Sequence, residues 1–272
     1  MFGKFIVDSS GEKVRTEDFD PNDTLELTKD GTREDDARLR KRLRALQDVL
    51  YASKKRALLI VLQGMDSSGK DGTVKKVLAD ISPTGFNVEA FKVPTPAELL
   101  HDYLWRVHQK TPQRGDIVVL NRSYYEDVLV TRVHGMVDDE TAHRRFSEIR
   151  NFEDYLTDND TVVLKFFLHI SKDFQREKLL KRLECPEKNW KFSASDLEER
   201  KCWDDYQRCY GDVLSHTSTK RAPWHVVPAN HRWFRDYFIL HAVVHALEEM
   251  HLEYPVLEDG VRHLMRELRE EQ

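Results

Sequence analysis

The sequence predicts a three-layer α/β/α fold with a central parallel sheet, on the basis of two observations. Short apolar runs at 58–62, 88–93, 115–120, 161–170 and 224–228 have the length and composition of buried strands. Segments with helical spacing of apolar residues separate several of these runs, most clearly 33–52 and 138–156. Strands that alternate with helices are typical of a parallel sheet covered by helices on both faces.

Length, composition and charge limit the class of protein. The 272 residues can bury one large core, which we expect from residues 56–252. Residues 1–55 are expected to wrap the surface and end in an amphipathic helix packed on the core, with 253–272 as a polar tail. The net charge of −5 argues against a general nucleic-acid or membrane binder.

The same features predict a compartment. No apolar run reaches the length of a membrane span, and the first residues carry too short an apolar segment for a secretory signal. Three cysteines, an odd number, agree with a reducing environment. We therefore expect a cytoplasmic protein.

A glycine-rich stretch follows the first buried run. Gly64 and Gly69-Lys70 have the G-x-x-x-x-G-K spacing of a loop whose backbone N–H groups and lysine cradle phosphates, between a strand and a helix. Asp71 stands where such loops usually have a Ser or Thr that holds magnesium, so a metal needs carboxylates from elsewhere, and Asp66 is the nearest. An ordinary strand, turn and helix is the alternative. The predicted phosphate ligands in the loop are Gly64, Ser67, Ser68, Gly69, Lys70, Asp71, Gly72 and Thr73.

A polar segment, Asn121-Arg-Ser-Tyr-Tyr-Glu-Asp127, follows the run at 115–120. Ligands of open parallel sheets bind outside the carboxyl ends of the strands, so this segment is expected to face the same crevice as the loop. Arg122 suits phosphate oxygens, and Arg132 extends the basic lining. Glu126 and Asp127 are candidate magnesium ligands together with Asp66. The alternative is a polar helix cap beside an unused strand end.

A basic segment after the run at 161–170 interrupts the apolar periodicity. Residues 184–205 are rich in lysine and aromatic side chains, which predicts a mobile cover rather than part of the core. Arg182, Lys188 and Lys191 are spaced for a surface that folds over a polyanion. Solvated charges without a ligand are the alternative. The glycine-rich loop, the polar segment at 121–127 and the basic cover at 184–205 together indicate a phosphotransferase. Such an enzyme positions Mg²⁺ and cations around the transferred group.

Five blocks of the sequence also resemble one family, the family-2 polyphosphate kinases. The resemblance covers about residues 15–255 and is carried by Gly64-Met-Asp-Ser-Ser-Gly-Lys-Asp-Gly-Thr73, by the segments 102–109 and 121–127, and by the segments 186–191 and 222–229. It implies a P-loop kinase fold with a helical lid at about 184–205. It also implies magnesium-dependent transfer between inorganic polyphosphate and nucleotides, with ADP and AMP as acceptors and ATP as a product or donor.

Carried over to this chain, the resemblance assigns Asp66 and Lys70 to the loop chemistry, Arg122 to the phosphate chain and Arg182 to the lid. Together with Asp127, the candidate metal ligand after the strand, these are the expected catalytic residues. The resemblance also implies nucleotide contacts by Asn121, Tyr125, Glu126 and Arg182, and a homo-oligomer. Many members have Asp where this chain has Asn121, so the metal would depend on Asp66, Glu126 and Asp127. The main alternative is an ATP-dependent nucleoside-monophosphate kinase of the thymidylate type, and a nucleotide-sensing module without turnover is a third possibility.

Overall fold

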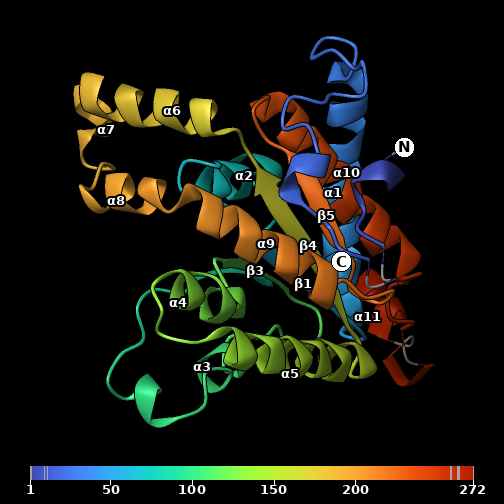
Figure 1. The fold of residues 1–272 in the computed structure, drawn as a ribbon. Coiled ribbons are helices and arrows are strands. Elements are labelled where there is room, and N and C mark those ends of the chain that lie inside the picture. Colours follow the sequence, from blue (N-terminus) through green and yellow to red (C-terminus); the bar gives the residue numbers. More distant parts are fainter. Residues whose placement is uncertain (1, 9, 11, 258, 262–263, 272) are drawn as a thin grey trace.

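The computed structural model describes residues 2–8, 10, 12–257, 259–261 and 264–271. Its centre is a sheet of five parallel strands in the order β2-β3-β1-β4-β5 (Figure 1). The strands are β1 (Ala57–Gln63), β2 (Phe86–Ala90), β3 (Ile117–Asn121), β4 (Thr161–His169) and β5 (Trp224–Pro228). Each matches an apolar run of the sequence, although β2 starts and ends earlier than the run at 88–93.

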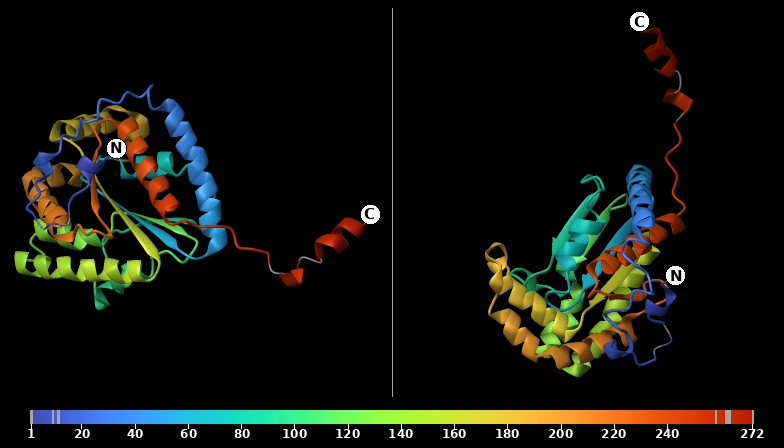
Figure 2. Two further views of the ribbon diagram at one scale, coloured as in Figure 1. Left: turned by 90° about the vertical axis from the view of Figure 1, so that its right-hand side faces the viewer. Right: turned by 90° about the horizontal axis from the view of Figure 1, so that it is seen from above.

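Helices cover both faces of the sheet, which confirms the predicted α/β/α class (Figures 1 and 2). On one face α10 (Arg232–Glu249) packs against α1 (Arg33–Ser53) and α2 (Lys70–Val77). On the other, α5 (Asp139–Asp158) packs against β4 and against α9 (Trp203–Thr217), which also contacts α4 (Val130–Val133). Helices α2, α5 and α9 lie in the connections between successive strands, because parallel strands cannot be joined by a tight turn.

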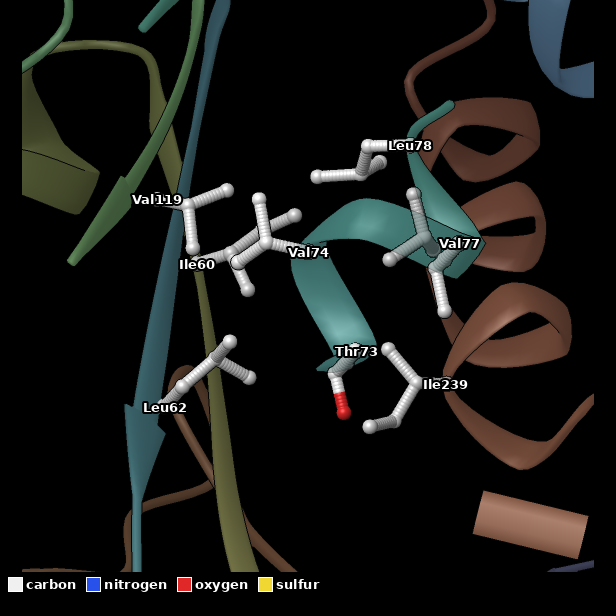
Figure 3. Close-up of a pocket in the computed structure, with 9 residues that line it drawn as sticks. Ile60, Leu62, Thr73, Val74, Val77, Leu78, Val119 and Ile239 are labelled. Carbon is white, nitrogen blue, oxygen red and sulfur yellow. The ribbon is translucent and has the colours of Figure 1, made fainter. Parts of the chain in front are cut away.

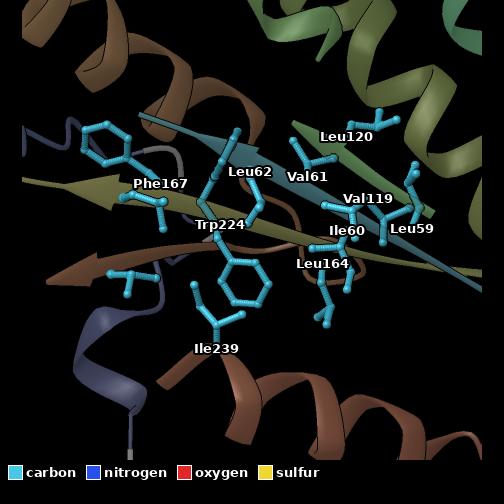
Figure 4. Packing of buried hydrophobic residues seen from close by; sticks show 14 of the residues in the cluster. Leu59, Ile60, Val61, Leu62, Val119, Leu120, Leu164, Phe167, Trp224 and Ile239 are labelled. Atoms are coloured by element: carbon cyan, nitrogen blue, oxygen red, sulfur yellow. The ribbon is translucent and has the colours of Figure 1, made fainter. Parts of the chain in front are cut away.

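The core lies around β1, the middle strand, in which every residue is buried. Figure 4 shows its Leu62 and Ile60 among side chains of the neighbouring strands and of α10. The register pairs Leu62 with Asn121 of β3 and Gln63 with Phe167 of β4. The carboxyl ends of β1 and β3 therefore lie side by side, which brings the glycine-rich loop next to the polar strand-end segment.

The N-terminal extension is anchored more deeply than expected. Phe2 and Phe5 are buried, and their rings pack against Phe234 and Phe238 of α10. The backbone N–H of Val7 donates to the carbonyl oxygen of Trp224 in β5 at 2.9 Å. The expectation that this segment only wraps the surface is wrong, because two aromatic anchors among polar residues are enough to fix it to the core. Two 3₁₀ turns, η1 (Gly3–Phe5) and η2 (Thr16–Asp18), lie in it.

The segment from Ala97 to Gln109 contains two short elements. It forms a 3₁₀ turn, η3 (Glu98–Leu100), and one short helix, α3 (Trp105–His108). The carboxylate of Asp102 accepts hydrogen bonds from the backbone N–H groups of Leu104 and Trp105, both at 3.0 Å. Asp competes for backbone donors in this way, and the bonds start α3 afresh after a break.

Three helices stand away from the sheet (Figure 1). They are α6 (Lys172–Glu184), which the Ser171 side chain caps, α7 (Pro186–Asn189) and α8 (Ser195–Lys201). A break at Cys202 separates α8 from α9. The C-terminal segment, with η5 (Asp259–Val261) and α11 (Leu264–Glu270), projects from the body (Figure 2). Within the described ranges, no helix is both long and apolar enough to cross a membrane.

Candidate active site

The glycine-rich loop joins β1 to α2. Gly64 and Gly69 have φ angles of +151° and +100°, and glycine reaches such angles without the strain that other residues incur. The Lys70 ammonium folds back over the loop and donates to the carbonyl oxygens of Gly64, at 2.6 Å, and Met65, at 3.3 Å. Burial lowers the pKa of Lys70, and the charge of Asp66 opposes this shift. The lysine is thus held inside the loop, where phosphate-binding lysines act.

An arginine that the sequence did not reveal supports the loop from α10. Arg235 is almost fully buried; its Nη1 donates to the carbonyl oxygen of Ser68 at 3.2 Å, and its other guanidinium nitrogens bond to Asp236. A Cβ added to Gly69 would lie 1.9 Å from Nη1 of Arg235. Glycine at 69 is therefore needed for close approach as well as for its φ angle.

The hydroxyls of Ser67, Ser68 and Thr73 share one property. All are buried and have no hydrogen-bond partner among the described residues, so their capacity to bind a ligand oxygen is unused. The side chain of Thr73 also lies beside Ile239 and Val77, at a small apolar pocket between α2, the sheet and α10 (Figure 3). The phosphate contact of the Thr73 hydroxyl stays a prediction.

Arg122 follows β3 and meets the loop across the strand ends. Its backbone N–H donates to the carbonyl oxygen of Leu62 at 3.2 Å, which extends the β1–β3 pairing by one residue. Its Nη2 lies 3.0 Å from Oδ1 of Asp66, and the two side chains are 47% and 25% exposed. Arg122 has a φ of +64°, which is unfavourable for a residue with a Cβ atom. Strain of this kind is concentrated at functional sites.

The two departures from the usual loop chemistry contact each other. Nδ2 of Asn121 donates to Oδ1 of Asp71 at 2.5 Å. Asp71 occupies the loop position of the usual Ser or Thr, and Asn121 the strand-end position of the usual Asp. In this chain the carboxylate of the pair therefore stands at the start of α2 and the neutral amide at the strand end.

Glu126 lies in the 3₁₀ turn η4 (Tyr124–Val128) and faces the loop. Burial raises the pKa of Glu126, while the charges of Arg122 and Lys70 oppose the increase. In the orientation that satisfies both of its amide atoms, Gln63 donates to Oε1 of Glu126 at 3.2 Å. Asp66, Lys70, Arg122 and Glu126 therefore form one group of interacting charges at the ends of β1 and β3.

Asp127 lies elsewhere, contrary to expectation. Its carboxylate faces Arg106, whose Nη2 is 3.8 Å from Oδ2, and Arg145 donates to its carbonyl oxygen at 2.7 Å. Burial raises the pKa of Asp127, and these two arginines oppose the increase. Successive residues of a 3₁₀ turn point about 120° apart, so Glu126 and Asp127 cannot both face the loop. The expected metal and catalytic roles of Asp127 are not retained.

Two further predicted contacts do not fit the structure. Tyr125 is fully buried, and its hydroxyl donates to Glu153 at 2.8 Å, so it has no surface for a nucleotide. Arg132 is also buried, and its guanidinium contacts Asp139 at 2.6 Å and Asp212 at 2.7 Å. With two carboxylate partners, Arg132 holds α4 to its neighbours and does not line the phosphate site.

Arg182 lies on the protruding helix α6, and Lys191 lies in the connection between α7 and α8. Nη1 of Arg182 contacts Oδ2 of Asp196 at 2.9 Å and donates to the carbonyl oxygen of Lys191 at 3.3 Å. Lys191 is exposed, and its ammonium lies 4.9 Å from the ring centroid of Trp190. The structure therefore brings these cations to each other and not to Lys70. Helices α7 and α8 have no buried residue, in agreement with a segment outside the core.

The carboxylates near the loop can be compared with the ligands that a magnesium ion requires. Mg²⁺ usually binds one or two protein carboxylates, with substrate phosphates and water completing its shell. Asp66 and Glu126 meet this requirement, because both interact with Lys70 and Arg122 around the loop. In the part of the chain that the structure describes, no three or more His, Cys, Asp or Glu residues gather as a complete metal site. The residues present thus fit a metal that arrives with phosphate.

Four residues of this region were absent from the sequence-based prediction. They are Gln63, Gln175, Tyr210 and Arg235. Gln175 of α6 donates to the carbonyl oxygen of Asp66 at 3.0 Å, and Tyr210 of α9 is near enough for Glu126, Arg122 and Asp66 to affect its pKa, which burial raises. Gln63 and Arg235 are polar residues that interrupt apolar stretches, and this interruption was the available sign in the sequence of a role at the site.

The loop, its lysine and a strand-end arginine meet at the carboxyl edge of a parallel sheet, where P-loop phosphotransferases hold the group they transfer. The fold and site define a protein of that class. The sequence model of a protein family described as polyphosphate kinase 2 matches residues 26–255 of the chain. The chain belongs to the polyphosphate kinase 2 family, which confirms the resemblance seen in its sequence motifs.

Individual relatives agree with this assignment. The chain is 47% identical over 254 residues to an AMP/ADP-polyphosphate phosphotransferase of Meiothermus ruber, with 93% of this chain and 95% of the relative covered. It is 43% identical over 242 residues to an ADP-polyphosphate phosphotransferase of Rhodopseudomonas palustris, with 85% and 84% covered. The crystal structure of polyphosphate kinase 2 from Arthrobacter aurescens TC1 superposes with a TM-score of 0.88 at 38% identity and covers 96% of this chain and 98% of that one.

Proposed function

We propose that the protein transfers the terminal phosphoryl group of inorganic polyphosphate to ADP and AMP, reversibly and with Mg²⁺. The observation that carries the proposal is the group formed by Asp66, Lys70, Arg122 and Glu126 around the loop. The activities of the Meiothermus and Rhodopseudomonas relatives support the choice of donor and acceptors. They favour polyphosphate over the ATP donor of a thymidylate-type kinase.

In the proposed reaction a terminal phosphate oxygen of ADP or AMP attacks the end phosphorus of polyphosphate in line with the bond that breaks. Phosphoryl transfer depends on positioning and on cations around the equatorial oxygens. Lys70 and the loop N–H groups hold the transferred group, together with the Ser67 and Ser68 hydroxyls. Arg122 neutralises charge that develops in the transition state, which is worth about 2 to 4 kcal/mol for one donor of this kind.

Asp66 and Glu126 would hold the metal, and when bound it neutralises phosphate charge and aligns donor and acceptor. Asp66 also contacts Arg122, so the same carboxylate orients the arginine when no substrate is present. Asn121 keeps Asp71 at the rim of the loop, where we place the nucleotide phosphates. The catalytic unit in this proposal is residues 56–252.

The proposed lid is the segment at about 184–205, which contains α7 and α8. Its proposed polyanion-binding cations are Lys188 and Lys191, together with Arg182 near the end of α6. Closure would exclude water, which otherwise hydrolyses the donor.

We further propose a cytoplasmic homo-oligomer that binds neither nucleic acid nor membranes. The net charge of −5 and the odd number of cysteines support that part of the proposal.

A donor and acceptor screen tests the function. Purified protein is mixed with Mg²⁺ and polyphosphate, and with ADP or AMP, and the products are separated by ion-exchange chromatography. We expect ATP from ADP, and ADP followed by ATP from AMP. Formation of product only when ATP replaces polyphosphate as donor would establish the thymidylate-type alternative. Binding without product from either donor would establish a sensing module.

A further inference from the structure

A fully buried polar cluster lies behind the turn that carries Arg122 and Glu126. It consists of Glu153 from α5, Lys165 from β4, and the adjacent Tyr124 and Tyr125 of η4 (hereafter the buried anchor). Lys165 is 0% exposed and Glu153 1%, and Nζ of the lysine lies 2.6 Å from Oε2 of the glutamate. None of these side chains belongs to the phosphate-binding loop.

All hydrogen-bonding groups of the buried anchor are used within the protein. The hydroxyls of Tyr124 and Tyr125 both donate to Oε1 of Glu153 at 2.8 Å. Besides Glu153, the Lys165 ammonium donates to Oη of Tyr125 at 3.1 Å and to the carbonyl oxygen of Thr217 at 2.6 Å. The cluster therefore has no free donor among the described residues and is closed to solvent, and any effect on catalysis must pass through the residues that it holds.

A buried ion pair such as that of Glu153 and Lys165 adds little to the stability of the fold. The cost of removing two charges from water is close to the gain from their attraction, and apolar replacements of buried ion pairs are often neutral or stabilising. A fully satisfied polar network does, however, fix one arrangement of the groups it joins, because any displacement leaves a buried group unpaired. Here those groups are the two tyrosines between Arg122 and Glu126.

The backbone at this point needs such support. Arg122 has a φ of +64°, outside the regions that residues with a Cβ prefer. A strained residue persists only when its surroundings leave no alternative. On one side Arg122 is held by the hydrogen bond from its N–H to Leu62. On the other side, Ser123 bonds to the N–H of Tyr125 at 3.2 Å, and the tyrosine hydroxyls are tied to Glu153.

We propose that Glu153 and Lys165 are positioning residues for phosphoryl transfer, which act through the two tyrosine hydroxyls on the turn that carries Arg122 and Glu126. This inference rests on the proposed roles of Arg122 and Glu126 in the reaction. The buried anchor ties that turn to β4 in the sheet, and to α5 and the end of α9 in the layer opposite α2. The arginine therefore meets the loop in one fixed place.

The test removes the tyrosine hydroxyls and leaves the rings. Tyr124→Phe, Tyr125→Phe and the double variant are compared with the wild-type protein for kcat, for KM of polyphosphate and ADP, and for Tm. We expect kcat of the double variant to fall about 10- to 100-fold, since small displacements of a positioning group have effects of this size. Both KM values should stay within about twofold, because an interaction of the transition state is affected.

Tyr237→Phe is the matched control. Tyr237 is 5% exposed, and its hydroxyl donates to Oδ2 of Asp35 at 2.8 Å, between α10 and α1. This variant also loses a buried hydroxyl that bonds to a carboxylate, so its Tm should fall while its kcat stays at the wild-type value. All assays are run well below the lowest Tm. If the double variant does not fold, Tyr124→Phe alone decides, because its hydroxyl bonds only to Glu153.

Arg122→Ala, measured in the same assay, separates two kinds of failure. If Arg122→Ala keeps the wild-type kcat, the proposed site is wrong and the inference fails with it. If Arg122→Ala loses activity but the tyrosine variants lower only Tm, as Tyr237→Phe does, the buried anchor has a purely structural role and the inference alone is refuted. A fall in kcat that exceeds the control's at unchanged KM supports it.

Discussion

Arg122 combines backbone strain with the proposed chemistry, so two substitutions can separate the two properties. Arg122→Ala and Arg122→Gly both remove the guanidinium, and each should raise the barrier by about 2 to 4 kcal/mol, or lower kcat about 30- to 1,000-fold. The lost contact with Asp66 lies at a half-exposed position, so it should cost below about 1 kcal/mol of stability in both variants.

Only the glycine variant also relieves the backbone. At a φ of +64°, a residue with a Cβ is disfavoured by about 1 to 2 kcal/mol, and the greater freedom of glycine in the unfolded chain offsets about 0.5 to 1 kcal/mol of that. Arg122→Gly should therefore be more stable than Arg122→Ala by about 0.5 to 1 kcal/mol, which raises Tm by about 1 to 3 °C in a chain of this size.

The assay measures Tm by calorimetry and kcat with polyphosphate and ADP on the same preparations. We expect both variants to be nearly inactive and Arg122→Gly to have the higher Tm. The reasoning about strain is refuted if the Tm of Arg122→Ala is equal or higher. The reasoning about charge is refuted if either variant keeps the wild-type kcat.

Three further predictions concern the loop, the acid limb and the core. Gly69→Ala should abolish turnover, because the added Cβ displaces the Arg235 guanidinium beneath the loop. Gly135→Ala is the control and should lower Tm alone, because Gly135 also has a positive φ but has nothing within 4 Å of an added Cβ. If Glu126 must be ionised, its raised pKa should make kcat fall with decreasing pH earlier than an ordinary carboxyl would; a pH–rate profile of Glu126→Gln with an unchanged acid limb would contradict this. Burial lowers the pKa of His225 to about 4, so stability present above pH 6.5 should decline toward pH 4, by about 2 kcal/mol at pH 5. In His225→Gln the fall in Tm between these pH values should be smaller.

Local pattern was sufficient for the centre of the fold. The run at 58–62 and the spacing of Gly64 and Lys70 predicted β1, the loop and α2, because each depends on residues close in sequence. That Arg122 faces the same crevice as the loop followed from the rule that parallel strands end at one edge, and in the structure it contacts Asp66 there. This prediction required only the direction of the strands.

The remaining site residues depended on information that spacing does not contain. Whether Glu126 or Asp127 faces the loop is set by the tight 3₁₀ turn after β3, which neither composition nor periodicity reveals. The family resemblance implied a nucleotide contact for Tyr125, whereas its hydroxyl bonds to Glu153 and Lys165 on distant elements, inside the protein. Arg235 reaches the loop from α10, and no local signal connects positions so far apart.

The contact between Asn121 and Asp71 has a consequence for how such chains can diverge. A change of Asn121 to Asp alone would set two negative charges face to face, and a change of Asp71 to Ser alone would leave the pair without any negative charge. Each single step passes through an unfavourable intermediate, so the two positions are expected to mutate together. A sequence that carries one of these residues without the other should then need a compensating change nearby.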